Sequence, residues 1–375
     1  MSSALLGCIF GALISGWCAD KLGRKLPLIL SAVLFSASAW GTAVASHFDM
    51  FVVYRIVGGV GIGLASALSP LYIAEVSPAE KRGRFVAVNQ LTIVIGVLAA
   101  QLINLMIAEP VEPGATQQMI VDSWNGQMGW RWMFASGVIP CILFCILVFV
   151  IPESPRWNVM MGRDDQALAM LTKVSNAAHA QNLLKEIKDS LQQDQQQQHR
   201  KLNYGDVRVR FILFVGCMIA MLQQVTGVNV MMYYAPVVLK TVTENAQEAL
   251  FQTIWIGVLQ LVGSVIGAML MDRMGRIPLM RYGTLGAIAG LLLTSYALYT
   301  QATGYFALFG MLFFMVFYAL SWGVGAWVLV SEIFPNRMRA QGMSIAVGCM
   351  WVANFAVSQS FPMINDHPYL FSHFH

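Results

Sequence analysis

Long apolar stretches alternate with short polar segments along almost the whole chain. Ten of these stretches approach or exceed the ~20 residues that a helix needs to cross a bilayer. We predict membrane spans at 2–19, 27–46, 50–74, 85–108, 131–151, 208–239, 249–271, 279–300, 304–330 and 341–364. Between the fifth and sixth spans lies a polar segment with helical periodicity that ends in a glutamine-rich run. The pattern predicts an all-α membrane protein with five spans on each side of a helical linker.

Composition supports a membrane protein and argues against other classes. Of the 375 residues, 57% are hydrophobic and only 11% are charged, and the mean hydropathy is +0.62. A soluble domain usually carries about 25% charged residues, so this chain cannot cover itself with a water-facing surface. The net charge of +4 gives no indication of nucleic-acid binding. Because the sequence shows no nucleophile–base pair, phosphate-binding loop or metal cluster, we expect neither an enzyme nor a cofactor.

A short basic motif occurs twice and indicates duplicated halves. DKLGRK begins at Asp20 and DRMGR begins at Asp272, each time between two apolar spans. Many transporters consist of repeats that enclose one site between them. One span precedes the motif in the first half and two precede it in the second, so we expect ten of twelve spans, with the first and last helices missing. The expected domains are an N-terminal bundle at 1–152, a linker at 153–207 and a C-terminal bundle at 208–375.

The positions of Lys and Arg predict the orientation in the membrane. They gather in alternate loops and in the linker, whereas the opposite loops carry mainly Asp and Glu. Cytoplasmic loops are enriched in positive charge. We therefore expect a multi-pass protein of a cell inner membrane or plasma membrane, embedded in the lipid bilayer, with a cytoplasmic linker.

Amide side chains in the fourth span form the first candidate for a binding site. Gln90, Gln101 and Asn104 are separated by 11 and 14 residues, which brings them within about 40° of one face of a helix. An amide has donors and an acceptor, which suits a neutral polyol better than an ion. The same side chains could equally hydrogen-bond neighbouring helices. The spacing favours neither interpretation.

The sixth span carries the densest polar cluster within any apolar stretch. Its polar and helix-weakening residues are Gln223, Gln224, Thr226, Gly227, Asn229, Tyr233, Tyr234 and Pro236. Irregular backbone within a bilayer is tolerated only beside a cavity or inside protein. Amides combined with aromatic rings suit a sugar, with packing of the core as the alternative. In the ninth span, Trp322 and Trp327 are candidates for a stacking platform or for packing.

Charged residues suggest coupling and gating. Arg55 lies within the third span, and we expect its partner on the missing helix, unless the side chain reaches an interface. Glu75 precedes Arg82, and Glu332 precedes Arg339, in a second repeated order. Together with the two Asp–Arg turns, these residues could form a charge network that closes one end of the protein. A single exposed ion pair contributes little free energy, so only a network of several pairs is suited to holding a gate closed.

Seven motifs together resemble the sugar porter family of the major facilitator superfamily, and MFAS from Met133 and the ending from Phe361 look closest to its bacterial D-xylose–proton symporters. The seven motifs are DKLGRK from Asp20, RIVGGVGIG from Arg55, YIAEVSPAEKRGR from Tyr72, PESPRW from Pro152, QQVTGVNVMMYYAP from Gln223, DRMGR from Asp272 and SEIFPNRMR from Ser331. The resemblance covers essentially the whole chain. It implies the major facilitator fold with two pseudo-symmetric helix bundles, alternating access and a monosaccharide site between the halves.

The resemblance also implies roles for individual residues. The sugar would contact Gln90, Gln223, Gln224, Asn229 and Trp327, with Tyr233 nearby and Gln101 where facilitative glucose transporters tend to have Gln. Arg55 would pair with a proton-accepting Asp of the first helix. The cytoplasmic gate would contain Asp20, Arg24, Glu75, Arg82, Asp272, Arg276, Glu332 and Arg339.

Some positions depart from the family pattern and leave the function open. Gly137 stands where the xylose symporters have Glu, Met350 replaces a polar residue, and Val324 stands where Pro is usual. We expect a monomeric transporter of a pentose or hexose, with proton symport as the leading mechanism. The alternatives are a facilitator that moves sugar without protons and a sugar sensor that does not transport.

Overall fold

The computed structural model describes residues 2–78, 82–110, 117–174, 176–196, 206–232, 246–300, 305–335 and 338–365. Throughout these residues the regular structure is helical, which confirms the all-α prediction. Among the described residues, ten helical segments are long and apolar enough to cross a membrane. Their positions agree with the ten predicted spans to within a few residues, except that the fifth begins earlier, at Asn125, and the sixth is described only to Met232.

The first half of the chain forms one group of helices. In chain order these are α1 (Ser2–Leu22), α2 (Lys25–Val44), α3 (Phe48–Val76), α4 (Arg82–Ile107), α5 (Gln117–Asp122), the π-helix η2 (Asn125–Gly129), α6 (Trp130–Ser136) and α7 (Val138–Val150). The linker follows as α8 (Pro155–Met160), α9 (Asp164–Val174) and α10 (Ala177–Gln196).

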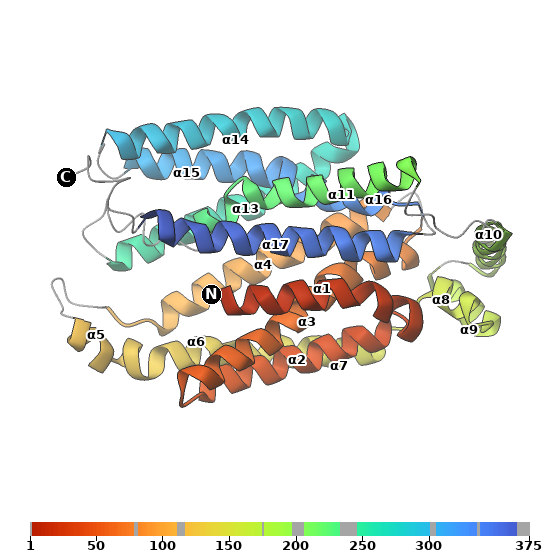
Figure 1. Cartoon of the computed structure of the whole chain (residues 1–375), viewed down its shortest axis with the longest axis horizontal. Coiled ribbons are helices and arrows are strands. Elements are labelled where there is room, and N and C mark those ends of the chain that lie inside the picture. Colours follow the sequence, from red (N-terminus) through yellow and green to blue (C-terminus); the bar gives the residue numbers. More distant parts are fainter. Residues whose placement is uncertain are drawn as a thin grey trace.

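The second half contains the remaining helices of the described residues. They are α11 (Val207–Val225), α13 (Ala246–Met274), α14 (Arg276–Tyr299), α15 (Tyr305–Tyr318), the π-helix η4 (Ala319–Gly323), α16 (Val324–Ile333) and α17 (Arg339–Asn365). The long helices run roughly parallel to one another, and α8, α9 and α10 lie together beyond one end of them (Figure 1). We call this end of the molecule the linker end.

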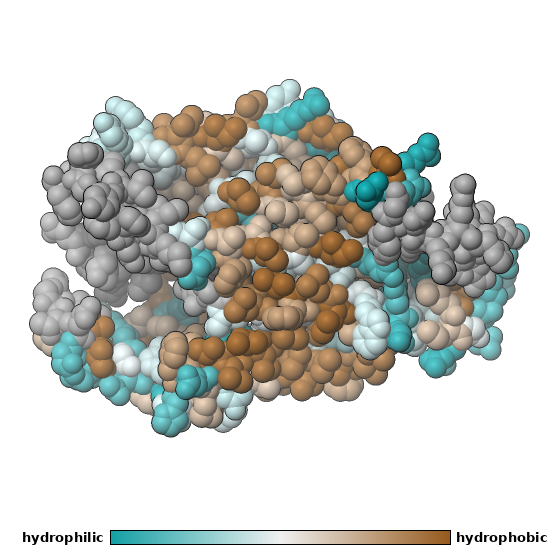
Figure 2. Space-filling view, in the orientation of Figure 1, coloured by the Kyte–Doolittle hydropathy of each residue, from teal (hydrophilic) through white to brown (hydrophobic). Residues whose placement is uncertain are grey.

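The surface along the long helices is apolar. Figure 2 shows a broad hydrophobic band across the middle of the molecule, with hydrophilic residues gathered toward the two ends. Large side chains such as Phe10, Ile139, Phe211 and Leu285 are exposed within the candidate spans. In α7 only Val148 is buried. Helices that are apolar all round suit a lipid environment, because their backbone groups are already hydrogen-bonded internally.

Helices α1 and α3 pack at very short range through two facing glycine pairs. Gly7 and Gly11 on α1 lie against Gly59 and Gly63 on α3, and each pair has the GxxxG spacing. A Cβ atom at any of these four positions would lie 2.0–2.2 Å from a carbonyl oxygen of the other helix. Such small-residue interfaces let helices pack closely in membranes, where no hydrophobic effect drives them together.

Two helices contain irregular turns that the apolar pattern alone does not predict. The ninth span passes from α15 through the π-helix η4 into α16, so its bulge lies at Ala319–Gly323. The break that Gly227 predicts in the sixth span is confirmed, because α11 ends at Val225 and Gly227 has φ +86°. Helical backbone resumes at 228 and is described to 232. Pro236 lies outside the described residues.

The two halves meet toward the linker end. Helix α17 lies beside α1, and α13 lies beside α4. Val86 and Ala87 of α4 belong to a buried cluster with Met271, Val324 and Val328 from the second half. These residues form an apolar contact between the halves at this end.

The glycine contact predicts the effect of one added methyl group. In Gly59→Ala, the new Cβ would lie 2.0 Å from the Ala4 carbonyl oxygen, so α1 and α3 must move apart. Overpacking of this kind costs about 1–3 kcal/mol. We expect a lower apparent melting temperature in detergent, followed by tryptophan fluorescence. Gly96→Ala is the control, because a Cβ there meets nothing within 4 Å. Equal losses in the two variants would contradict the packing described.

Candidate functional site

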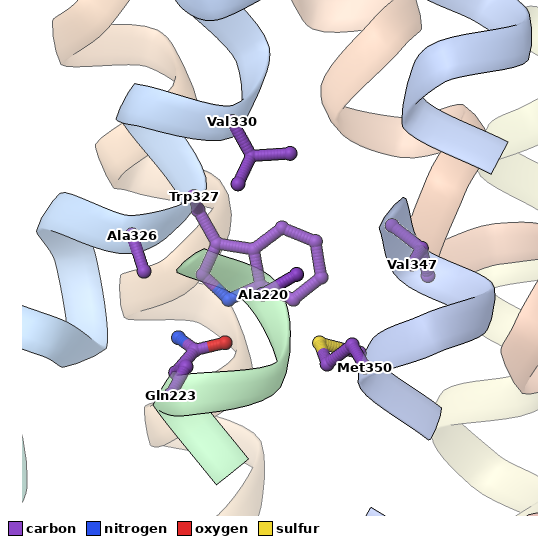
Figure 3. Close-up of a pocket in the computed structure, with 7 residues that line it drawn as sticks. All are labelled: Ala220, Gln223, Ala326, Trp327, Val330, Val347 and Met350. Carbon is purple, nitrogen blue, oxygen red and sulfur yellow. The ribbon is translucent and has the colours of Figure 1, made fainter. Parts of the chain in front are cut away.

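A small cavity lies between three helices of the second half (Figure 3). Its lining comes from α11, α16 and α17 and consists of Ala220, Gln223, Ala326, Trp327, Val330, Val347 and Met350. Its volume is about 10 Å³, which is about the space that a single water molecule occupies. A monosaccharide therefore requires side chains to move before it can enter.

The break in α11 holds Gln223 at this cavity. The helix stops at Val225, and the left-handed conformation of Gly227 is one that glycine adopts without strain. The carbonyl oxygen of Gln223 accepts hydrogen bonds from Thr226 Oγ1 at 2.7 Å and Tyr318 Oη at 3.4 Å. The side chain of Gln223 donates from Nε2 to the Trp322 carbonyl oxygen at 3.0 Å. Gln223 is therefore held from both its backbone and its side chain.

Gln224 and Asn229 lie on the two sides of the break and bond to each other. Asn229 Nδ2 donates to Gln224 Oε1, and Gln224 is buried while Asn229 is half-buried. Within the described part of the chain, the Gln224 amide N–H groups and the Asn229 carbonyl oxygen have no other partner. These groups are available to a ligand, although neither residue lines the cavity of Figure 3.

The amides of the fourth span differ in their surroundings along α4. Gln90 is buried, and its Oε1 has no hydrogen-bond partner among the described residues. Gln101 Oε1 also lacks a partner there and lies against Gly257 of α13. Asn104, near the end of the helix, is exposed. Neither Gln90 nor Gln101 lines the cavity.

Buried polar atoms also occur on α13, opposite α4. Gln260 Oε1 and Ser264 Oγ have no hydrogen-bond partner in the described residues, and both residues are buried. Because a buried acceptor without a partner costs about 1–3 kcal/mol, these atoms are typical of a region that holds water or ligand. No group of three described His, Cys, Asp or Glu side chains could hold a metal ion.

The structure separates the roles of the two tryptophans in the ninth span. Trp322, within η4, donates from Nε1 to Thr284 Oγ1 at 2.8 Å and packs against the apolar cluster around Met315. Trp327 instead presents its indole to the cavity (Figure 3). The ring of Trp327 is therefore the one placed to stack on a ligand.

Arg55 lies on α3 and is half-buried. Its guanidinium carbon is 5.4 Å from the centre of the Phe134 ring, a distance at which a cation is attracted to the ring face. Gly137, one turn further on, ends α6, and a Cβ there would meet only the Phe134 carbonyl oxygen at 3.2 Å and Ala39 at 4.0 Å.

Arg24 and Glu75 form a buried ion pair at the linker end of the first half. The two side chains are 2.6 Å apart and are 3% and 5% exposed. Arg24 also donates from Nη1 to the Ala19 carbonyl oxygen at 2.7 Å. Glu75 of one repeated motif thus pairs with Arg24 of the other.

The start of the linker completes this network through residues for which the sequence predicted no role. Glu153 accepts hydrogen bonds from the backbone N–H groups of Arg24 at 2.9 Å and Lys25 at 3.0 Å. Ser154 donates to Glu75 at 2.5 Å and caps α8 with Pro155 at its first turn. The PESPRW motif was the available signal, because an acid followed by Ser-Pro predicts a helix start.

The second half contains an equivalent ion pair that is more exposed than the pair in the first half. Arg276 Nη2 lies 2.8 Å from Glu332 Oε1, and the two side chains are 38% and 40% exposed. Gly23 and Gly275, one residue before the two arginines, have φ of +85° and +82°. The two basic turns therefore share a backbone conformation as well as a sequence.

Asp20 and Arg339 also lie at the linker end of the molecule. Three other predicted site residues cannot be placed. The Asp20 carboxylate accepts a hydrogen bond from Gln341 of α17 and so joins the two halves. Arg339 is half-buried at the start of α17. The side chains of Arg82 and Asp272 lie outside the described part of the structure, as does the whole of Tyr233.

Two side chains of α17 form further hydrogen bonds with the first half. Ser344 Oγ lies 2.6 Å from the Ala12 carbonyl oxygen and 3.0 Å from that of Leu13. Trp351 Nε1 donates to Ser66 Oγ at 3.2 Å. These contacts lie between the linker end and the middle of the spans, and they hold the halves together there.

Comparison with known proteins identifies the family. The family model "Sugar (and other) transporter" matches residues 1–374. The chain belongs to this family. It is 40% identical to the D-xylose-proton symporter of Escherichia coli, and the match covers 100% of this chain and 77% of that protein.

Solved structures agree with this assignment. The proton:xylose symporter XylE bound to 6-bromo-6-deoxy-D-glucose matches with a TM-score of 0.87 and 41% identity, covering 100% of this chain and 80% of that one. The inward-open conformation of XylE from E. coli matches less well, with a TM-score of 0.77 at 39% identity over 98% of this chain and 79% of that one. The major facilitator fold that we expected is confirmed.

The two arginine–glutamate pairs provide a matched test of burial. Glu75→Gln leaves the Arg24 charge buried without its counter-charge, which typically costs about 3–5 kcal/mol. Glu332→Gln removes the corresponding acid from a partly exposed pair, where about 0–1 kcal/mol is expected. We therefore expect a large fall in apparent melting temperature for the first variant and little change for the second. Similar melting temperatures for the two variants would contradict the buried network.

Proposed function

We propose that this protein carries a monosaccharide, a pentose or hexose resembling xylose, across a membrane by alternating access. The observation that carries the proposal is the placement of Gln223 and Trp327 at one cavity beside a broken helix, in a member of a transporter family. An amide that hydrogen-bonds hydroxyl groups and a ring that stacks on a sugar face are the groups that carbohydrate recognition needs. The mechanism involves no covalent chemistry, and the protein acts as a monomer in the lipid bilayer.

The two halves supply the moving parts of this mechanism. We assign residues 1–152 and 208–375 to the two bundles and 153–207 to a linker on the cytoplasmic side, which the clustering of positive charge supports. The Ser344, Asp20 and Val86 contacts between the halves support a state closed at the linker end. The lower similarity to an inward-open relative agrees with this state.

The sugar site combines amides from both halves. Gln223, Gln224 and Asn229 contribute from the second half, and Tyr233 follows them in sequence. Gln90 and Gln101 contribute from α4, and their carbonyl oxygens without partners support a role in binding water or sugar. Trp327 provides the stacking surface.

A network at the linker end serves as the gate. Arg24–Glu75 and Arg276–Glu332 pair within each half, and Asp20 reaches across to the other half. Arg82, Asp272 and Arg339 belong to the same repeated motifs and are assigned to the gate with them. When the linker end opens, these contacts between the halves separate while the buried pair within the first half stays formed.

Proton coupling is the proposed source of energy, with Arg55 as its charged element. The D-xylose-proton symporter relative supports symport, and Arg55 is the candidate because it lies half-buried within a span. An uncoupled facilitator is the second candidate, and Gly137 favours it because that position carries no carboxylate beside Phe134.

Removal of the cavity amide tests the sugar site. In proteoliposomes, Gln223→Ala should raise the KM for D-xylose about tenfold, because one net hydrogen bond to the sugar is lost. Gln192→Ala, on the exposed surface of α10, is the control and should leave KM unchanged. Unaltered uptake by Gln223→Ala would refute the proposed site.

Proton movement tests the coupling. Adding D-xylose to vesicles that contain the protein should raise the external pH as protons enter with the sugar. Arg55→Leu should abolish accumulation against a gradient while exchange of labelled for unlabelled sugar continues. Arg208→Gln, on the exposed start of α11, is the matched control. Sugar entry without any change in external pH would identify a facilitator.

A further inference from the structure

The wall of the cavity formed by α17 is apolar. It consists of Val347 and Met350, which lie three residues apart on one face of the helix. Met350 is 3% exposed, and its thioether lies across the cavity from the Gln223 amide (Figure 3). A ligand held by Gln223 and Trp327 therefore meets a methionine on its far side.

The polar groups that remain for a ligand lie opposite this wall. Gln223 uses Nε2 to bind the Trp322 carbonyl oxygen. Its Oε1, together with the Trp327 indole N–H, has no partner among the described residues. Together they offer one acceptor and one donor. Met350 has only a weakly accepting sulfur and no donor. The cavity thus has one face that can satisfy hydroxyl groups and one that cannot.

This asymmetry has a consequence for which sugar binds. A hydroxyl group pressed against Met350 loses its hydrogen bonds to water and gains none, whereas a C–H or methyl group loses nothing there. We propose that Met350 is a specificity-determining residue, which selects a monosaccharide presenting a carbon-bound hydrogen or methyl group, rather than a hydroxyl, to α17. The proposal rests on the monosaccharide function proposed above and specifies its substrate class.

The same residue is suited to making room for the ligand. The cavity of about 10 Å³ is too small for a sugar ring. Met350 is unbranched and has three rotatable side-chain bonds, so it can change conformation more easily than the β-branched Val347 and Val330. Met350 is therefore also the lining residue that moves most readily when the ligand enters.

A set of sugars that differ by single hydroxyl groups tests the proposal. Binding of D-glucose and of its 2-, 3-, 4- and 6-deoxy derivatives to the purified full chain would be measured by calorimetry, with D-xylose as a reference. For one derivative, loss of the hydroxyl should tighten binding to the unaltered protein by about tenfold. In Met350→Gln, which offers an amide at the same place, the same loss should weaken binding. Met350→Leu, an apolar control of similar size, should keep the original order.

The outcomes distinguish the proposed role of Met350 from the proposed monosaccharide function. If no deoxy derivative binds the unaltered protein more tightly than D-glucose, the role of Met350 is wrong, whether or not Met350→Gln folds. The same conclusion follows if Met350→Gln keeps the original order of affinities. If the unaltered protein binds none of these sugars, including D-xylose, the monosaccharide function itself is wrong.

Discussion

Backbone groups freed inside a bilayer must find partners within the protein, and this constraint organises the candidate site. Gly227 interrupts α11, and the Gln223 carbonyl oxygen beside the break accepts hydrogen bonds from Thr226 and Tyr318. The Gln223 side chain in turn bonds the carbonyl of Trp322 within the π-helical turn of the ninth span. The two irregular helices therefore supply hydrogen-bond donors to each other's backbone carbonyl groups. Their mutual support fixes the amide and the following Trp327 beside one cavity.

The linker end shows how a duplicated sequence produces two unequal structures. Arg24 and Arg276 follow left-handed glycines and bind equivalent glutamates, yet the first pair is buried and the second is exposed. The difference arises from Glu153 and Ser154, which bind the first turn and cover it. The ion pair of the first half is therefore held by more hydrogen bonds than the exposed pair of the second half.

The membrane-spanning helices were predictable because the bilayer sets both the length of the apolar stretches and the distribution of charge in the loops. The helix break was predictable from Gly227, since only glycine adopts that conformation freely. Other features depended on contacts between distant segments. The π-helix at Ala319–Gly323 has no proline to announce it, and the partner of Glu75 lies 51 residues earlier in the chain. Asn104 is exposed near the end of α4, and helical spacing alone does not predict how exposed a residue is.

A structure of the protein with D-xylose bound, determined by electron microscopy or crystallography, is the most direct test of this account. We predict density for the sugar between α11 and α16, with a hydroxyl group within hydrogen-bonding distance of Gln223 and the Trp327 ring against the sugar. Sugar bound elsewhere, or a Gln223 side chain turned toward lipid, would contradict it.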